Sequence, residues 1–121
     1  MRLEPDLIRD ILTFAEAIPA GAHRDIPALG EYDQITVNCH ARHLHAAGYL
    51  EGVIIEDSVG RPGCCRITDL SWKGHEFLSL ARNNEGWAWA KKSLSGKALS
   101  MSISALTRAL EAYTLIQLGI K

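Results

Sequence analysis

The chain of 121 residues has no long apolar run, no apolar leader segment and few cysteines. A membrane-spanning helix needs about 20 consecutive apolar residues, and a secretory signal needs a basic start followed by an apolar core. The opening, Met-Arg-Leu-Glu-Pro-Asp, offers neither. We therefore expect a cytoplasmic protein that does not enter a membrane. Its cysteines, Cys39, Cys64 and Cys65, are then expected to be reduced thiols.

The sequence also lacks an excess of positive charge, since its formal net charge is −1. Residues 31–66 carry three arginines against five acids, whereas residues 67–121 carry seven Lys or Arg against four acids. Surfaces that bind nucleic acid attract phosphates through clustered Lys and Arg. The central segment therefore has the wrong sign for holding a phosphate backbone.

Recognisable catalytic patterns are missing too: there is no phosphate-binding glycine loop, no Ser/His/Asp order and no carboxylate pair. The cysteines and the histidines of residues 40–45 are the candidates for a zinc site. Cys39 and His43 lie one helical turn apart, but Cys64 and Cys65 are adjacent and would point to opposite faces of a strand. Structural zinc sites usually show paired short spacings. We expect no metal, no cofactor and no enzymatic activity.

The chain does contain alternating helix and strand patterns, with 47% hydrophobic residues, enough for the core of one domain. Proline early in a helix, Asp as N-cap and glycine after the last turn mark the boundaries. The patterns predict a helix from Pro5 to the stop at Pro19, a short strand within His23–Leu29, a helix from the N-cap Asp33 to Gly48, strands at Val53–Ile55 and Cys64–Leu70 around a Gly60–Gly63 turn, a helix from the cap Ser71 to Asn83, a helix over Glu85–Lys92, a connector over Ser93–Ser100 and a helix over Met101–Leu118.

This order of helix, short strand, helix, two-stranded wing and helix is typical of a winged helix. The expected fold class is α+β, mostly helical, with a winged-helix domain over residues 1–82. Residues 83–121 are expected to form a helical extension that packs on the domain or on a partner subunit. One departure is the segment between Ile18 and Asp33, which is too broken for the second helix of an ordinary helix-turn-helix.

In the helix after Asp33, the positions expected to face inward are Ile35, Cys39 or His40, His43 or Leu44, and Ala47. Ala41 is then expected to face outward with four polar residues. An outward polar face can read base edges, and basic residues on a wing can contact phosphates. The candidate nucleic-acid-binding residues are Gln34, Asn38, Arg42 and His45 on this helix, and Arg61 and Arg66 on the wing.

A second candidate surface is C-terminal. The helix opened by Ser71 has four side chains that supply apolar surface, Trp72, Phe77, Leu78 and Ala81. Phe77 is expected in the core, and Trp72 in the core or at an interface. Trp87 and Trp89 are two positions apart on a helix, so one of them should be exposed. The last helix carries an apolar stripe, Leu99, Ile103, Leu106, Leu110 and Tyr113, which predicts a homodimer; the alternative is that it packs back on its own chain. The expected partner-binding residues are Trp87, Trp89, Leu106, Leu110 and Tyr113.

Two phrases, Leu-x-x-Ala-Gly-Tyr-Leu-Glu at 44–51 and Leu-Ser-x-x-Gly-x-x-Phe at 70–77, resemble the two ends of the wing in many bacterial winged-helix regulators. Nearly the whole chain resembles a family of small proteins of unknown function found often in phages and prophages. The matching residues are Asp6–Leu12, Tyr32, His40, Leu44, Ala47-Gly48, Leu70-Ser71-Trp72, Gly74-His75-Glu76-Phe77-Leu78, Arg82, Trp87 and Lys91. The chain departs in having Ser71 where threonine is usual and Asn83-Asn84 where acids are usual.

That resemblance implies a winged-helix fold and an origin in a mobile element, and it implies no established activity. Our first functional expectation is a regulator that binds double-stranded DNA through the helix and wing residues given above. The alternative is a protein-interaction module, a phage accessory protein that binds a host or phage protein. The near-neutral charge and the pair Trp87 and Trp89 favour the alternative.

Overall fold

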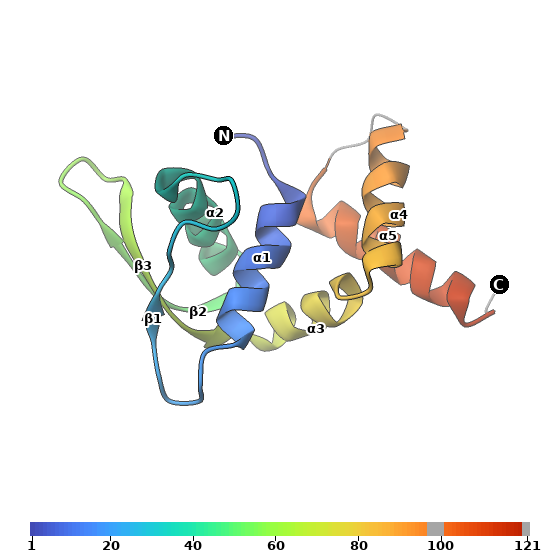
Figure 1. The fold of residues 1–121 in the computed structure, drawn as a ribbon, viewed down its shortest axis with the longest axis horizontal. Coiled ribbons are helices and arrows are strands. Elements are labelled where there is room, and N and C mark those ends of the chain that lie inside the picture. The colour runs from blue at the N-terminus through green and yellow to red at the C-terminus, as the bar shows by residue number, and fades with distance from the viewer. Residues whose placement is uncertain (97–100, 120–121) are drawn as a thin grey trace. The chain divides into compact units, whose positions relative to one another are not determined.

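The structure is a computed structural model that describes residues 1–96 and 101–119 (Figure 1).

The first helix shows how the sequence determines the fold. Helix α1 (Pro5–Glu16) begins with proline in its first turn, where the missing N–H costs nothing. Its predicted inward face is confirmed, with Leu7, Ile8, Ile11, Leu12 and Ala15 buried. This face packs against α2 and β3.

The remaining elements follow the predicted order, so the predicted α+β class is confirmed. They are β1 (Arg24–Asp25), α2 (Gln34–Ala46), β2 (Leu50–Glu56), β3 (Pro62–Leu70), α3 (Trp72–Ala81), α4 (Asn84–Gly96) and α5 (Ile103–Gln117). They form two compact units, Met1–His75 and Glu76–Lys121. The boundary between the units lies inside α3, earlier in the chain than the predicted boundary after residue 82.

The sheet has three antiparallel strands in the order β1-β3-β2. The β2–β3 hairpin reaches beyond α2 at the left of Figure 1. A bulge between Glu51 and Gly52 shifts the register, and Gly52 there has φ 149°. A Cβ on Gly52 would lie 2.2 Å from the carbonyl oxygen of Arg66, so only glycine fits this close approach.

Helix α2 begins as predicted, because the Asp33 carboxylate accepts a hydrogen bond from the Thr36 N–H at 2.9 Å. The predicted orientation of its faces is wrong. Asn38 and Ala41, expected outside, are buried, while Ile35, expected inside, is 44% exposed. Val37, Ala41 and Leu44 form the true apolar stripe, and two polar side chains are buried among them: Asn38 and His40.

The first turn of α3 lies directly against the chain that follows α2. Gly74 approaches so closely that a Cβ would lie 2.2 Å from the carbonyl oxygen of Tyr49. The Ser71 hydroxyl donates to the Gly48 carbonyl and accepts from the Gly74 N–H, which confirms Ser71 as a cap. The Lys73 ammonium donates to the Ala47 carbonyl at 3.2 Å and lies over the Tyr49 ring. The two sequence phrases that flank the hairpin therefore meet in space.

In the second unit, α4 and α5 pack across each other (Figure 1). Asn83 caps α4 by accepting from the Gly86 N–H at 2.8 Å, and Ser102 caps α5 through the Ala105 N–H. The predicted helix over 85–92 continues to Gly96, so the start of the predicted connector is helical. The rest of that connector, residues 97–100 with Leu99, lies outside the described residues.

Gly74 provides a test of the α3 junction. We expect Gly74→Ala to lower the free energy of unfolding by about 1–3 kcal/mol, because the added methyl group meets backbone that cannot yield easily. Gly96→Ala is the matched control, since nothing lies within 4 Å of a Cβ there. Chemical denaturation of both variants measures the difference. Equal stability of the two variants would mean that α3 does not approach Tyr49 so closely.

Candidate functional site

The helix residues expected to read DNA bases are bound to the protein itself. The Gln34 amide nitrogen donates to the Ile26 carbonyl at 3.0 Å and to the Asn38 side-chain oxygen at 2.8 Å. Asn38 is 3% exposed and donates to the Pro62 carbonyl at 3.0 Å, so its predicted place on an outward face is wrong. It ties α2 to the start of β3.

The other two predicted base-reading residues are also engaged with the hairpin. Arg42 donates to the Gly60 carbonyl at 3.4 Å, and the His45 Nε2 lies 3.0 Å from the Gly52 carbonyl. Both side chains are half-buried. Three of the four helix residues, Asn38, Arg42 and His45, therefore hold the hairpin on α2 through hydrogen bonds. Gln34 instead binds the Ile26 carbonyl and Asn38.

Each of the two arginines predicted to contact phosphates lies beside an aspartate. Arg61 is paired with Asp57 at 2.9 Å, and Arg66 with Asp25 at 3.1 Å. The Asp57 carboxylate also accepts hydrogen bonds from the N–H groups of Arg61 and Val59 at 3.0 Å. These bonds, the one from the Arg61 N–H above all, hold the pKa of Asp57 below its usual value. The acid therefore stays charged near neutral pH and offsets the positive charge that a phosphate would need.

The predicted partner surface on α4 and α5 is largely internal. Trp87 is buried edge-on against Phe77, with ring centroids 6.3 Å apart. Leu106 and Leu110 are buried as well, so the prediction that they form a dimer surface is wrong. The expectation that one tryptophan of the pair is exposed is confirmed, since Trp89 is 38% exposed. Tyr113 is half-buried and lies 5.7 Å from the Trp89 ring, between centroids.

Sequence reasoning missed the largest exposed apolar side chain. Trp72, expected in the core or at an interface, is 79% exposed at the first position of α3. The residues three positions before and after Trp72 are Asp69 and His75, which are polar and lie 3.7 Å apart as a pair. Trp72 therefore belongs to no apolar stripe. That lack of apolar neighbours at helical spacing was the available signal.

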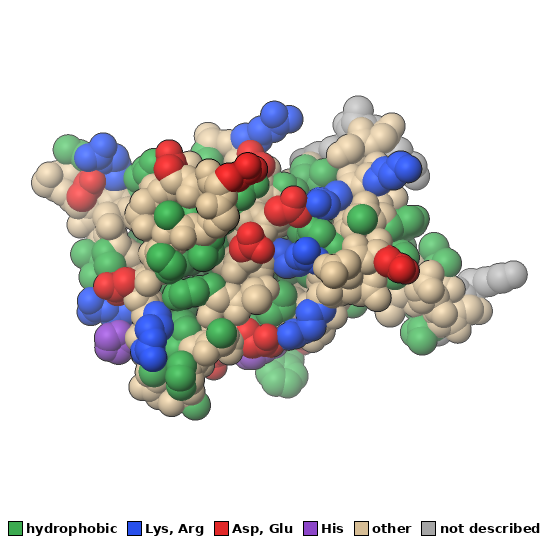
Figure 2. Space-filling model, viewed as in Figure 1, with side chains coloured by type: hydrophobic (Ala, Val, Ile, Leu, Met, Phe, Trp, Pro, Cys, Tyr) green, Lys and Arg blue, Asp and Glu red, His purple; other side chains and the backbone are tan. Residues whose placement is uncertain are grey.

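A second missed feature is the outer face of the hairpin. Val53, Ile55 and Val59 are all exposed. Figure 2 shows hydrophobic side chains at the surface over the hairpin, beside charged side chains of both signs. The run Val53–Ile55 lies in β2, as predicted. Of these three residues only Ile54, which pairs with the buried Cys65, is on the side of the sheet that faces α2. A strand in a protruding hairpin must show its other side to solvent.

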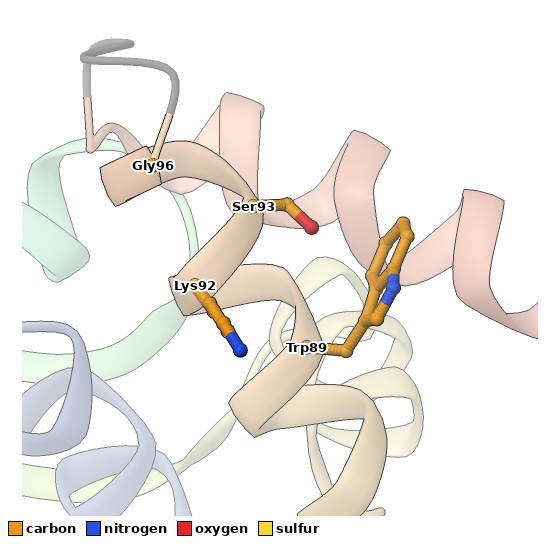
Figure 3. A pocket seen from close by; sticks show the side chains of 4 residues that line it. All are labelled: Trp89, Lys92, Ser93 and Gly96. Atoms are coloured by element: carbon orange, nitrogen blue, oxygen red, sulfur yellow. The ribbon is translucent and has the colours of Figure 1, made fainter.

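A groove of about 460 Å³ lies along α4, lined by Trp89, Lys92, Ser93 and Gly96 (Figure 3). All four residues belong to this one helix, and the indole forms one wall. The buried side-chain nitrogen and oxygen atoms of the described residues all have hydrogen-bond partners, so none is left aimed at a ligand. The groove therefore offers a surface, with no assembled set of reactive groups.

Comparison with known proteins identifies the family. The family described as "Hypothetical protein (DUF2513)" matches residues 2–100. The chain belongs to this family. An uncharacterized protein of Haemophilus influenzae is 30% identical to this DUF2513 chain over 107 residues, which cover 88% of the chain and 89% of the relative. No solved structure shows significant similarity. The expectation of a family of unknown function is confirmed.

Two cysteines of this DUF2513 member, Cys64 and Cys65, are poor nucleophiles because the pKa of each thiol is raised. Burial raises the pKa of Cys65 to about 11, and its thiol donates to the Asn38 carbonyl at 3.6 Å. Burial and then the Asp25 carboxylate raise the pKa of Cys64. The thiolate is the reactive and metal-binding form.

Among residues 1–96 and 101–119, no three His, Cys, Asp or Glu side chains gather as metal ligands. In the same residues, no helix is long and apolar enough to cross a bilayer.

His40, a residue of the family resemblance, has a structural role. It is 1% exposed, and its Nδ1 lies 2.9 Å from the Thr36 carbonyl. Its Nε2 accepts a hydrogen bond from the Glu4 N–H at 3.0 Å. The ring is therefore neutral with the proton on Nδ1, because a proton on Nε2 would face another N–H. Glu4 makes no side-chain cap at the start of α1, so the imidazole anchors that end of the helix.

We expect His40→Ala to lower the free energy of unfolding by about 2–4 kcal/mol, because it opens a cavity and leaves the Glu4 N–H unsatisfied. The control is His43→Ala on the exposed side of the same helix, which should change stability by less than about 0.5 kcal/mol. Urea denaturation followed by circular dichroism measures both. Similar losses in the two variants would contradict the structural role of His40.

Proposed function

We propose that the protein is a non-enzymatic protein-interaction module built on a winged-helix frame, an accessory protein of a phage or prophage. In this proposal α2 stands at the position of the recognition helix, β2 and β3 form the wing, and α3 closes the frame. The mobile-element origin rests on the family resemblance. The observation that carries the proposal is that the polar residues suited to DNA are engaged in hydrogen bonds and ion pairs within the protein, while large apolar side chains, Trp72 above all, are exposed.

DNA readout needs donors and acceptors that are free to meet base edges, together with cations free to meet phosphates. Gln34, Asn38 and His45 make internal hydrogen bonds, and Asn38 is buried. The wing cations are neutralised in place by Asp57 and Asp25. Releasing them for phosphates would break contacts that organise the hairpin.

Trp72 is the best candidate for the centre of a protein interface. Tryptophan is enriched among the residues that dominate binding energy, because its large apolar ring gains much from desolvation. Trp72 stands on the rigid first turn of α3, between Ser71, which caps the helix, and Lys73, which holds the end of α2. The main chain at Trp72 is thus held before a partner arrives, which lowers the entropic cost of binding.

DNA binding is the second candidate, favoured by the frame itself. The outward side of α2 carries Arg42 and His43, and Arg61 is exposed at the wing. In a gel shift at low salt, Arg42→Ala and Arg61→Ala should each weaken binding, with a salt slope lower by about one for each lost phosphate contact. Absence of any shift with genomic DNA fragments would exclude this candidate.

The interaction function predicts that one protein from a host lysate is captured in stoichiometric amount after nuclease treatment. Trp72→Ala should reduce its recovery at least about tenfold, as expected for an anchor worth ~2 kcal/mol. Trp89→Ala, at the other exposed tryptophan, is the matched control and should retain capture. The eluate is measured by quantitative mass spectrometry, and each variant is checked for its native circular dichroism spectrum. A protein recovered only while nucleic acid is intact would count against the proposal.

A further inference from the structure

The hairpin leaves one long strand at the margin of the sheet. Among the described residues β2 pairs only with β3, so its other edge has no neighbouring strand. Edge strands present main-chain N–H and C=O groups in the spacing that a further strand would use. The stretch from Gly52 to Ile55 keeps a regular register between the two irregularities of the hairpin.

The pairing with β1 shows which groups of β2 point to the open edge. The Ile26 N–H donates to the Cys65 carbonyl at 2.9 Å, so the main chain of Cys65 is turned towards β1. Along a strand of an antiparallel ladder, the N–H and C=O of successive residues point to alternate sides. Two directly opposed residues either both point towards each other or both point away from each other. Ile54, the partner of Cys65, therefore turns its N–H and C=O away from β3.

The His45 side chain lies at the same edge beside Gly52, two residues before Ile54. Its Nε2 lies 3.0 Å from the Gly52 carbonyl, which points outward like the groups of Ile54. The imidazole closes the edge at Gly52 and leaves it open at Ile54. The open segment is thus short, and its main-chain groups have a defined place.

The side chains around Ile54 describe the strand that fits. Val53 and Ile55 are exposed on the outer face of the sheet and would lie beside apolar side chains of an added strand. Glu51 and Glu56 stand exposed at the two ends of β2. Asp57 follows, but its charge is offset by Arg61, with which it is paired at 2.9 Å. The edge is therefore apolar in the middle and acidic at both ends.

We propose that the edge of β2 at Ile54 accepts an extended segment of the partner protein as a fourth strand, with apolar residues beside Val53 and Ile55 and Lys or Arg beside Glu51 and Glu56. This proposal rests on the interaction function proposed above and names the chemistry of its partner. Main-chain hydrogen bonds hold such a segment, and the flanking charges select it.

A second copy of the chain fits this edge poorly. Antiparallel pairing of two β2 strands about Ile54 would place Glu51 of each copy opposite Asp57 of the other. Like charges directly opposite on neighbouring strands destabilise the pair. The acids at the ends of β2 therefore oppose self-association and favour a basic partner segment.

The test uses the full chain and two capped peptides, acetyl-Thr-Lys-Val-Thr-Val-Thr-Lys-amide and the same peptide with Glu in place of both Lys. At low salt, the basic peptide should bind about tenfold more tightly than the acidic one, as two exposed ion pairs of ordinary strength predict. In ¹H–¹⁵N spectra, the Ile54 amide should exchange rapidly in the free protein and become protected on binding. A basic peptide with Pro at its central position should not protect it.

The charge-reversed variant Glu51→Lys/Glu56→Lys should prefer the acidic peptide. Glu31→Lys/Glu111→Lys, which makes the same change of net charge at exposed acids elsewhere, should keep the original preference. Protection of the Ile54 amide in the free protein would overturn the proposal, as would binding that ignores peptide charge. If a lysate protein is captured through Trp72 while neither peptide binds, the edge proposal fails and the interaction function stands.

Discussion

The contact between Gly74 and the Tyr49 carbonyl is the constraint on which the first unit depends. It lets the first turn of α3 lie against the chain leaving α2, where Ser71 and Lys73 satisfy carbonyls that the end of a helix leaves without partners. Because α2 and α3 flank the hairpin in sequence, fixing their ends together also fixes where the hairpin starts and stops. The same contact sets Trp72 on a turn with little freedom to move.

The order of elements could be predicted because it follows from local signals. Asp33 and Ser71 cap helices, Pro5 opens one, and Gly48, with a positive φ of 89°, ends another. These are interactions between residues close in sequence, which periodicity and residue type report directly. The end of α4 was placed too early because serine and glycine were interpreted as a connector.

The orientation of α2 could not be predicted because it depends on polar residues buried by distant partners. Asn38 enters the core only because the Pro62 carbonyl and the Gln34 amide satisfy it, and His40 only because the Glu4 N–H meets its ring. A helix with these two residues inside carries a weak apolar pattern. The polar residues of α2 that were expected to read bases therefore form a polar network that holds the hairpin.

The proposed preference of the hairpin for a protein partner over a phosphate backbone is supported by a separate set of contacts. Its turn is organised by a carboxylate, since Asp57 binds two N–H groups and the guanidinium of Arg61. The Asp57 carboxylate offsets the positive charge of Arg61 at the tip of the hairpin, where a contact with phosphate would need that charge to be free. Apolar side chains along β2 then become the part of the hairpin that gains most from being covered. The neutralised charge at the tip and the hydrophobic surface along the strand thus support the proposed protein partner from separate physical causes.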